Sequence, residues 1–246
     1  MVDSTNVILP AAEAFTSGKL MVSEGLAAGS ADAVLGWSDY PLNAALIAVF
    51  TLLVLVTLKR FVNIAHNLFD GLSRWKACLA IEASVQQMED RNLIGYVCII
   101  PISMIADRYG FITAGLASTV PAAWHCLVPI AAIAAWLFVK HLFYKLISLR
   151  VRHVETFRIA HKAFYNYWIL ASLLLVMTVG VLAFLETPAE LGRKILLYEL
   201  GGIYFIGIIR QSQILSSTYG AVATFLYLCA LEFIPTAALI AGDILL

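Results

Sequence analysis

Two glutamates interrupt apolar stretches in the C-terminal part of the sequence. Glu199 lies in "LLYELGGIYFIG" and Glu232 lies in "FLYLCALEFIPTAAL". A carboxyl group in the middle of a membrane-spanning helix is costly, so we expect both side chains to face the interior of a helix bundle and Glu232 to be protonated there. Such groups bind or move protons and cations in transport proteins. The simpler alternative is a hydrogen bond that holds two helices together.

The two carboxyl groups are predicted at similar depths. Glu199 precedes Arg210 and Glu232 follows Tyr219 on consecutive antiparallel helices. A rise of about 1.5 Å per residue puts the two groups about 16 and 20 Å from the same membrane face. If the helices present them to each other, they could share a proton. The candidate intramembrane polar site therefore comprises Glu199, Glu232, Arg210 and Tyr204.

Motifs for other chemistry are absent from the sequence. It has no HExxH, no GxSxG in a protease context and no phosphate-binding loop. His125 is the only histidine within a predicted span, no two histidines are four residues apart, and the four cysteines form no CxxC pair. We therefore predict no catalytic residue, no cofactor and no metal ligand, and an enzyme is the least favoured class.

The composition identifies the environment in which these glutamates lie. Hydrophobic residues make up 61% of the chain and charged residues 13%, whereas a soluble domain has about 25% charged residues. Sixteen basic and sixteen acidic residues cannot cover the surface of a chain of this length, so we expect lipid to contact most of it. The net charge of zero gives no indication of nucleic-acid binding.

The fold class predicted from hydropathy is all-α, a polytopic membrane helix bundle. A helix needs about 20 mostly apolar residues to cross the hydrocarbon layer. Helix kinks are expected at Pro101, Pro129 and Pro235, since proline removes a backbone N–H and frees a carbonyl one turn earlier. The sequence predicts a single six-span domain over 41–246, with spans at 41–58, 91–107, 120–139, 163–185, 191–209 and 219–242.

Two amphipathic segments are expected at the cytoplasmic side. Between residues 60 and 92, apolar residues recur at three- and four-residue steps, which predicts a helix in the interface or packed on the base of the bundle. The basic segment that begins at Lys140 is expected to extend the third and fourth helices beyond the lipid as an elbow.

The orientation follows from the distribution of lysine and arginine. Twelve of the sixteen basic residues fall in loops on one side of the predicted spans, which the positive-inside rule assigns to the cytoplasm. Both termini are then extracytoplasmic, and residues 1–40 form an acidic arm there without a signal-peptide pattern.

The basic residues of the cytoplasmic side have two interpretations. They set the topology and contact anionic headgroups, or they form a docking surface for another protein. The residues predicted to contact lipid headgroups or a partner are Lys59, Arg60, Arg74, Lys76, Lys145, Arg150, Arg152, Arg158 and Lys162.

The segment "FLYLCALEFIPTAALI", which closes the chain, resembles the end of a family of Bacteroidota inner-membrane proteins catalogued as domain of unknown function 4271. The segments "WSDYPLNAALIAVFTLLVLV" and "DRNLIGYV" are also similar to that family, so the resemblance covers roughly 37–246. It implies a polytopic helical protein in the inner membrane of a bacterium with two membranes. It implies no reaction, cofactor or partner.

Two function classes follow from these patterns. The first is a non-catalytic scaffold or assembly component of a cell-envelope complex, with membrane lipids as partners and other envelope proteins or a second copy of the chain as further candidates. The alternative is a small proton-linked transporter or channel subunit that uses Glu199 and Glu232.

Overall fold

The structure is a computed structural model that describes residues 37, 40–73, 81–111, 120–121, 124–151 and 153–245. The chain divides into two units, Met1–Gly36 and Trp37–Leu246, and all that follows concerns the second. Most of the predicted acidic arm, residues 1–40, lies outside the described residues. Arg74, Lys76 and Arg152 also lie outside them.

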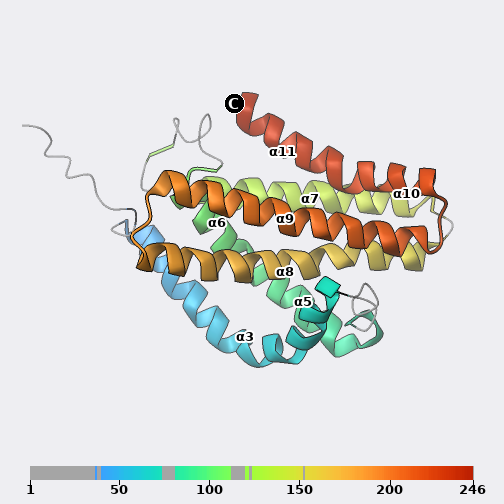
Figure 1. The fold of residues 1–246 in the computed structure, drawn as a ribbon, viewed down its shortest axis with the longest axis horizontal. Coiled ribbons are helices and arrows are strands. Elements are labelled where there is room, and N and C mark those ends of the chain that lie inside the picture. The colour runs from blue at the N-terminus through green and yellow to red at the C-terminus, as the bar shows by residue number, and fades with distance from the viewer. Residues whose placement is uncertain are drawn as a thin grey trace, which may run out of the picture. The chain divides into compact units, whose positions relative to one another are not determined.

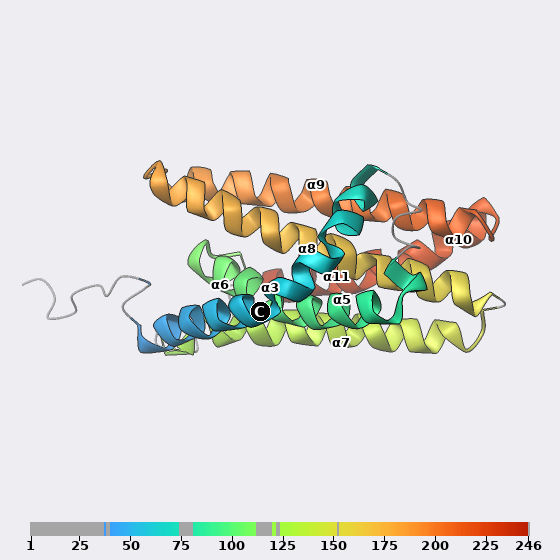
Figure 2. The same ribbon diagram turned by 90° about the horizontal axis from the view of Figure 1, so that it is seen from below.

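All secondary structure in the described ranges is helical, in agreement with the predicted fold class (Figure 1). In both ribbon views, α3, α7 and α9 run in one direction, and α5 with α6, α8, and α10 with α11 run in the opposite direction (Figures 1 and 2). The elements are α3 (Pro41–Ser73), α5 (Val85–Val97), α6 (Ile99–Arg108), α7 (Leu127–Ser148), α8 (Val154–Phe184), α9 (Ala189–Ser216), α10 (Ala221–Leu228), the π-helical turn η4 (Cys229–Phe233) and α11 (Ile234–Leu245).

Four helical stretches of the described chain are long and apolar enough to cross a membrane, which indicates a multi-pass membrane protein. The predicted spans 91–107 and 191–209 are not among them. The first is divided between α5 and α6 at Cys98, and the second lies in α9, which carries several charged residues. The four stretches are Pro41–Leu72, Leu127–Ser148, Val154–Phe184 and Ala221–Ala241.

The outward surface of α3 is apolar. Leu55 and Val56 have exposed fractions of 66% and 69%, and only 11% of the apolar stretch of this helix is buried. Contiguous exposed apolar surface of this kind is unfavourable in water. It is the surface that a helix presents to lipid.

Helix α8 forms the centre of the bundle, with α9 on one side and α3 and α5 on the other (Figures 1 and 2). Its buried aromatic side chains also hydrogen-bond to neighbouring helices. The hydroxyl of Tyr167 donates to the carbonyl of Gly71 at 2.9 Å, and Nε1 of Trp168 donates to the carbonyl of Gly95 at 3.2 Å. These bonds connect α8 to α3 and α5 through backbone carbonyls in the last turns of those helices, where a carbonyl has no intrahelical partner.

The predicted amphipathic helix over 60–92 is not one separate helix, and in this respect the prediction was wrong. Helix α3 continues through Lys59 and Arg60 to Ser73, because no glycine or proline occurs between Leu58 and Asp70. A new helix, α5, begins after Ser84, whose hydroxyl caps it. The predicted apolar face is nevertheless buried, with Ile64 and Leu68 almost fully covered by the bundle.

The second basic segment extends two helices as expected. Helix α7 continues beyond Val139 to Ser148, and α8 begins at Val154, nine residues before the predicted span. The described residues between the two helices are 149–151 and 153. The connection between α7 and α8 corresponds to the elbow that the sequence predicts.

The three predicted kink prolines have two settings. Pro129 is the third residue of α7 and does not bend its span, because a proline in a first turn lacks only an N–H that would have no intrahelical partner. Pro101 and Pro235 each follow an interruption of regular helix within a predicted span, as the kink prediction expects. Pro101 comes three residues after Cys98, which divides α5 from α6, and Pro235 comes two residues after the π-helical turn η4, where the N–H of Ile234 donates to the carbonyl of Cys229.

Candidate functional site

The carboxylate of Glu232 forms an ion pair with a lysine of another helix. Nζ of Lys140, on α7, donates to Oε2 of Glu232, on η4, at 2.6 Å. The two side chains have exposed fractions of 2% and 1%. A pair this well buried is stable only if geometry and additional contacts offset the loss of hydration.

Aromatic rings supply additional contacts to the ammonium group of Lys140. Its Nζ lies 3.1 Å from the ring centroid of Phe164, on α8, and 5.4 Å from that of Trp136, on α7. The face of an aromatic ring attracts a cation, most strongly where water is excluded. The ion pair therefore joins α7, α8 and η4 at one point.

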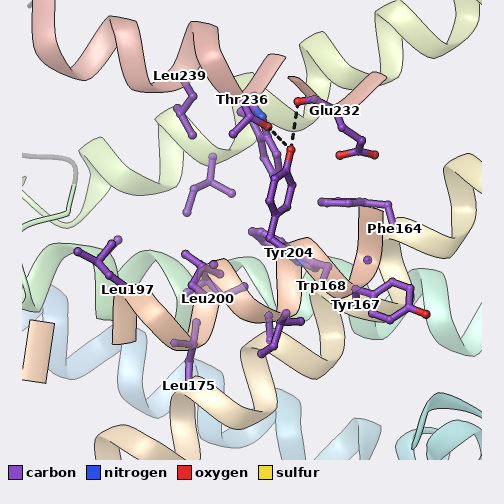
Figure 3. Close-up of a pocket in the computed structure, with 18 of the residues that line it drawn as sticks. Phe164, Tyr167, Trp168, Leu175, Leu197, Leu200, Tyr204, Glu232, Thr236 and Leu239 are labelled. Carbon is purple, nitrogen blue, oxygen red and sulfur yellow. Dashed lines mark hydrogen bonds between the residues drawn. The ribbon is translucent and has the colours of Figure 1, made fainter. Parts of the chain in front are cut away.

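Tyr204 connects α9 to the same region. Its hydroxyl donates to the backbone carbonyl of Glu232 at 3.2 Å and lies 3.0 Å from the hydroxyl of Thr236 (Figure 3). The carbonyl of Glu232 lies one turn before Thr236, where the π turn and Pro235 disturb the regular helical bonding. Tyr204 thus satisfies a backbone group at the irregular part of the last span.

Glu199, the second predicted glutamate, has a different partner. Its Oε1 accepts a hydrogen bond from the hydroxyl of Thr178, on α8, at 3.0 Å. It therefore faces α8, whereas Glu232 faces α7. The structure does not bring the two carboxyl groups together as a proton-sharing pair.

Arg210 also lies away from the glutamates. Its guanidinium donates to the carbonyl of Leu72 and to the side chain of Gln213, both at 2.8 Å. These bonds connect α9 to the C-terminal end of α3. Of the four predicted polar-site residues, only Tyr204 and Glu232 are in contact.

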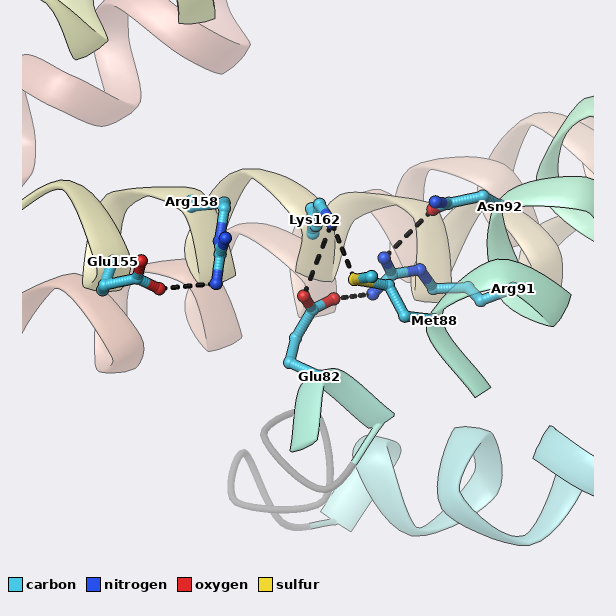
Figure 4. Close-up of polar contacts among 7 residues, drawn as sticks. All are labelled: Glu82, Met88, Arg91, Asn92, Glu155, Arg158 and Lys162. Atoms are coloured by element: carbon cyan, nitrogen blue, oxygen red, sulfur yellow. Dashed lines mark hydrogen bonds and ion pairs between the residues drawn. The ribbon is translucent and has the colours of Figure 1, made fainter. Parts of the chain in front are cut away.

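A second charged cluster lies where residues 81–83 meet α5 and α8 (Figure 4). The guanidinium of Arg91 is fully buried and pairs with the carboxylate of Glu82. Lys162, on α8, lies 3.6 Å from the same carboxylate and 3.1 Å from the sulfur of Met88. Arg91 also donates to Oδ1 of Asn92. Arg91 thus belongs to the interior of the bundle.

The predicted headgroup contacts divide by environment. Lys59, Lys145 and Arg150 are exposed, as headgroup contact requires. Arg158 is exposed but pairs with Glu155 at 2.5 Å. Arg60 is also exposed but lies 3.5 Å from the buried carboxylate of Asp90, and Lys162 is turned towards the buried Glu82 cluster.

A cavity of about 360 Å³ lies beside the ion pair. Helices α6, α7, α8, α9 and α11 contribute its walls, which are predominantly apolar and aromatic (Figure 3). Its polar groups include Glu232, Tyr204, Thr236 and Gln211. A cavity of this size within a helix bundle is large enough for a small ligand.

Sequence reasoning missed Lys140. It was counted only as a basic residue at the cytoplasmic end of the third span, yet it is buried against Glu232. One signal was available: Lys140 follows Trp136 by four residues and therefore shares its helix face. A buried acid also requires a partner, which a basic residue at a neighbouring span end can supply.

The described residues contain no group of three histidine, cysteine or acidic side chains that could hold a metal ion. Comparisons with protein-family models, with curated proteins and with solved structures give no match. The functional proposals below therefore depend on the geometry of the site and on the sequence patterns described above.

Proposed function

We propose that this chain is a non-catalytic component of the bacterial inner membrane, a scaffold or assembly component of a cell-envelope complex. The observation that carries the proposal is the buried ion pair of Lys140 and Glu232. Both charges are satisfied within the bundle, and aromatic rings surround the cation. Charges paired in this way hold helices together and are not free to follow a transport path.

The proposed topology has six crossings with both termini outside the cytoplasm. The alternating directions of the helices support it (Figures 1 and 2). A bond of 2.6 Å from Nε1 of Trp37 to Oδ2 of Asp107 also agrees with it, because it joins the start of α3 to the end of α6. Both are expected on the external side.

We also propose that the chain belongs to the family that its last span resembles. The similarity of the last span to the Bacteroidota family catalogued as domain of unknown function 4271 supports an inner-membrane location. The irregular last span, with Glu232 and Pro235 close to each other, is the part of the chain that carries this similarity.

Cross-linked purification from native membranes tests the scaffold proposal. Lys145 and Arg150 are exposed at the elbow end, and Arg193 and Lys194 are exposed at the opposite end. We expect a membrane partner at a fixed ratio to the wild-type protein. Lys145→Gln with Arg150→Gln should weaken its recovery, whereas Arg193→Gln with Lys194→Gln, the matched control, should not. Recovery of the protein alone in every sample would refute the proposal.

The second candidate is a proton-linked transporter centred on Glu232. The cavity beside the carboxylate favours it, since a transported ion or molecule needs space next to the titrating group. Glu232→Gln keeps a hydrogen-bonding group and removes the negative charge. Loss of proton uptake by proteoliposomes of this variant, with wild-type uptake present, would favour transport over the scaffold.

A further inference from the structure

The cavity beside the ion pair is elongated. Leu197 and Gln211, at its two ends on α9, are separated by about 21 Å of helix at about 1.5 Å per residue. Apolar side chains such as Leu175, Leu197 and Leu239 line one end (Figure 3). The polar groups Glu232 and Gln211 lie towards the other. One apolar chain with a polar head fits this division.

The cavity is accessible from the side of the bundle. Helix α11 separates from α9 towards the C-terminal end of the described chain (Figure 1). Leu197 and Gly201 on α9 and Ile240 on α11 line the cavity and are also exposed on the outer surface. In a membrane this surface faces lipid, so a molecule dissolved in the bilayer can enter between the two helices.

A buried polar atom without a partner gives a second, independent sign of a ligand. The indole N–H of Trp136, which lines the cavity, has no acceptor among the described residues. A buried polar group without a partner is unfavourable, so it is best explained by a group that binds there. Gln211, whose exposed fraction is 2%, adds a buried amide to the lining of the same cavity.

The charge of the polar end limits the chemistry of the ligand. The ammonium group of Lys140 and the carboxylate of Glu232 neutralise each other at 2.6 Å. A charged head placed beside them would lack a counter-ion in an apolar environment, which is costly. The head of the ligand should therefore be uncharged and able to hydrogen-bond.

We propose that this cavity binds a neutral single-chain amphiphile from the bilayer, whose uncharged polar head hydrogen-bonds to the side chain of Gln211. The volume of about 360 Å³ is near the lower limit of typical ligand cavities, about 300–1,000 Å³. It suits one apolar chain and not the two acyl chains of a phospholipid. The apolar chain extends along α9 towards Leu197.

Photolabelling of the purified protein in lipid nanodiscs tests this proposal. The probe is hexadecanol with a diazirine in its chain, and mass spectrometry maps the labelled peptides. We expect saturable labelling of α9 and α11 that unlabelled hexadecanol competes away. Diazirine-bearing palmitate and phosphatidylcholine should label these helices much less, while all three probes label the lipid-facing surface of α3 without saturation.

Two adjacent glycines supply a matched pair of variants. A Cβ added at Gly201 or at Gly202 meets no atom within 4 Å, and only Gly201 lines the cavity. Gly201→Phe should fill the cavity mouth and reduce specific labelling about tenfold or more, which corresponds to one decade of affinity. Gly202→Phe should leave it unchanged.

A third variant keeps the test decisive if Gly201→Phe does not fold. Gln211→Leu removes the buried amide and keeps a side chain of similar size, so the protein should still fold, while the apparent affinity for hexadecanol falls up to about tenfold. Equal labelling of wild type and Gln211→Leu would overturn the proposal. So would phosphatidylcholine labelling as strong and as saturable as that of hexadecanol, because the cavity would then hold bulk lipid.

Discussion

At the scale of single residues, the ion pair of Lys140 and Glu232 is the most constrained feature of the bundle. Its two members are 92 positions apart in sequence, on α7 and η4, and both are almost fully buried. Removal of one partner leaves the other charged in an apolar environment. Removal of both takes away the attraction and the cost of desolvation together.

The ion pair can be tested with single and double variants. Lys140→Met should lower the free energy of unfolding by about 3–5 kcal/mol, because Glu232 loses its counter-ion, and Lys140→Met with Glu232→Leu should recover most of that loss. Equilibrium unfolding in mixed detergent micelles measures both. Lys145→Met, an exposed position on the same helix, is the control and should change little. A double variant as unstable as the single one would argue against a mutual interaction.

The sequence anticipated one member of this pair and not the other. Glu232 stands out because a carboxyl group is rare in an apolar stretch, and its burial was predicted from that cost. Lys140 looks like any basic residue at the end of a span, since its position relative to Glu232 depends on how α7 packs against the last span. The same limit applies to Glu199, whose partner Thr178 depends on the rotation of α9 against α8.

At the scale of elements, close packing of α8 against α9 depends on glycine. A Cβ added at Gly207 would lie 3.3 Å from Cγ and 3.4 Å from Cβ of Tyr167. These atoms are at the root of the side chain, and the hydroxyl at its other end is bonded to Gly71. The ring therefore cannot move aside without the loss of a bond between α8 and α3.

The stability of the protein should respond differently to alanine at two nearby glycines of α9. Gly207→Ala is expected to destabilise the protein by about 1–3 kcal/mol through overpacking. Gly202→Ala meets no neighbour and should be neutral or stabilising by up to about 1 kcal/mol, since alanine favours the helix. Thermal unfolding followed by size-exclusion chromatography compares them. Equal effects at both sites would mean that α8 and α9 are not in close contact at Gly207.

Helix positions were predicted better than helix boundaries. The apolar stretches of α3, α7, α8 and the last span follow directly from hydropathy. The sequence did not indicate that α3 continues to Ser73, because a basic pair usually marks the end of a span. The π turn was not predicted either. Pro235 indicates only that regular bonding fails nearby, and it does not specify a π turn or the bond from Tyr204 to the carbonyl of Glu232.

At the scale of the whole molecule, contact with lipid instead of water explains the apolar outer surface of the bundle. Composition alone indicated this, because too few charged residues are present to cover the surface. The exposed apolar side chains of α3 agree with it. The function does not follow from composition in the same way, because hydropathy and charge do not specify the partner or ligand of a membrane protein.

The most direct test of the account is the location of the elbow and of the C-terminus relative to the membrane. Green fluorescent protein and alkaline phosphatase are fused in turn within the elbow between Leu149 and Arg150, and after Leu246. An even number of crossings with the basic end inside predicts fluorescence from the elbow fusion and phosphatase activity from the C-terminal fusion. Fluorescence from the C-terminal fusion, or a protein that is soluble without detergent, would contradict it.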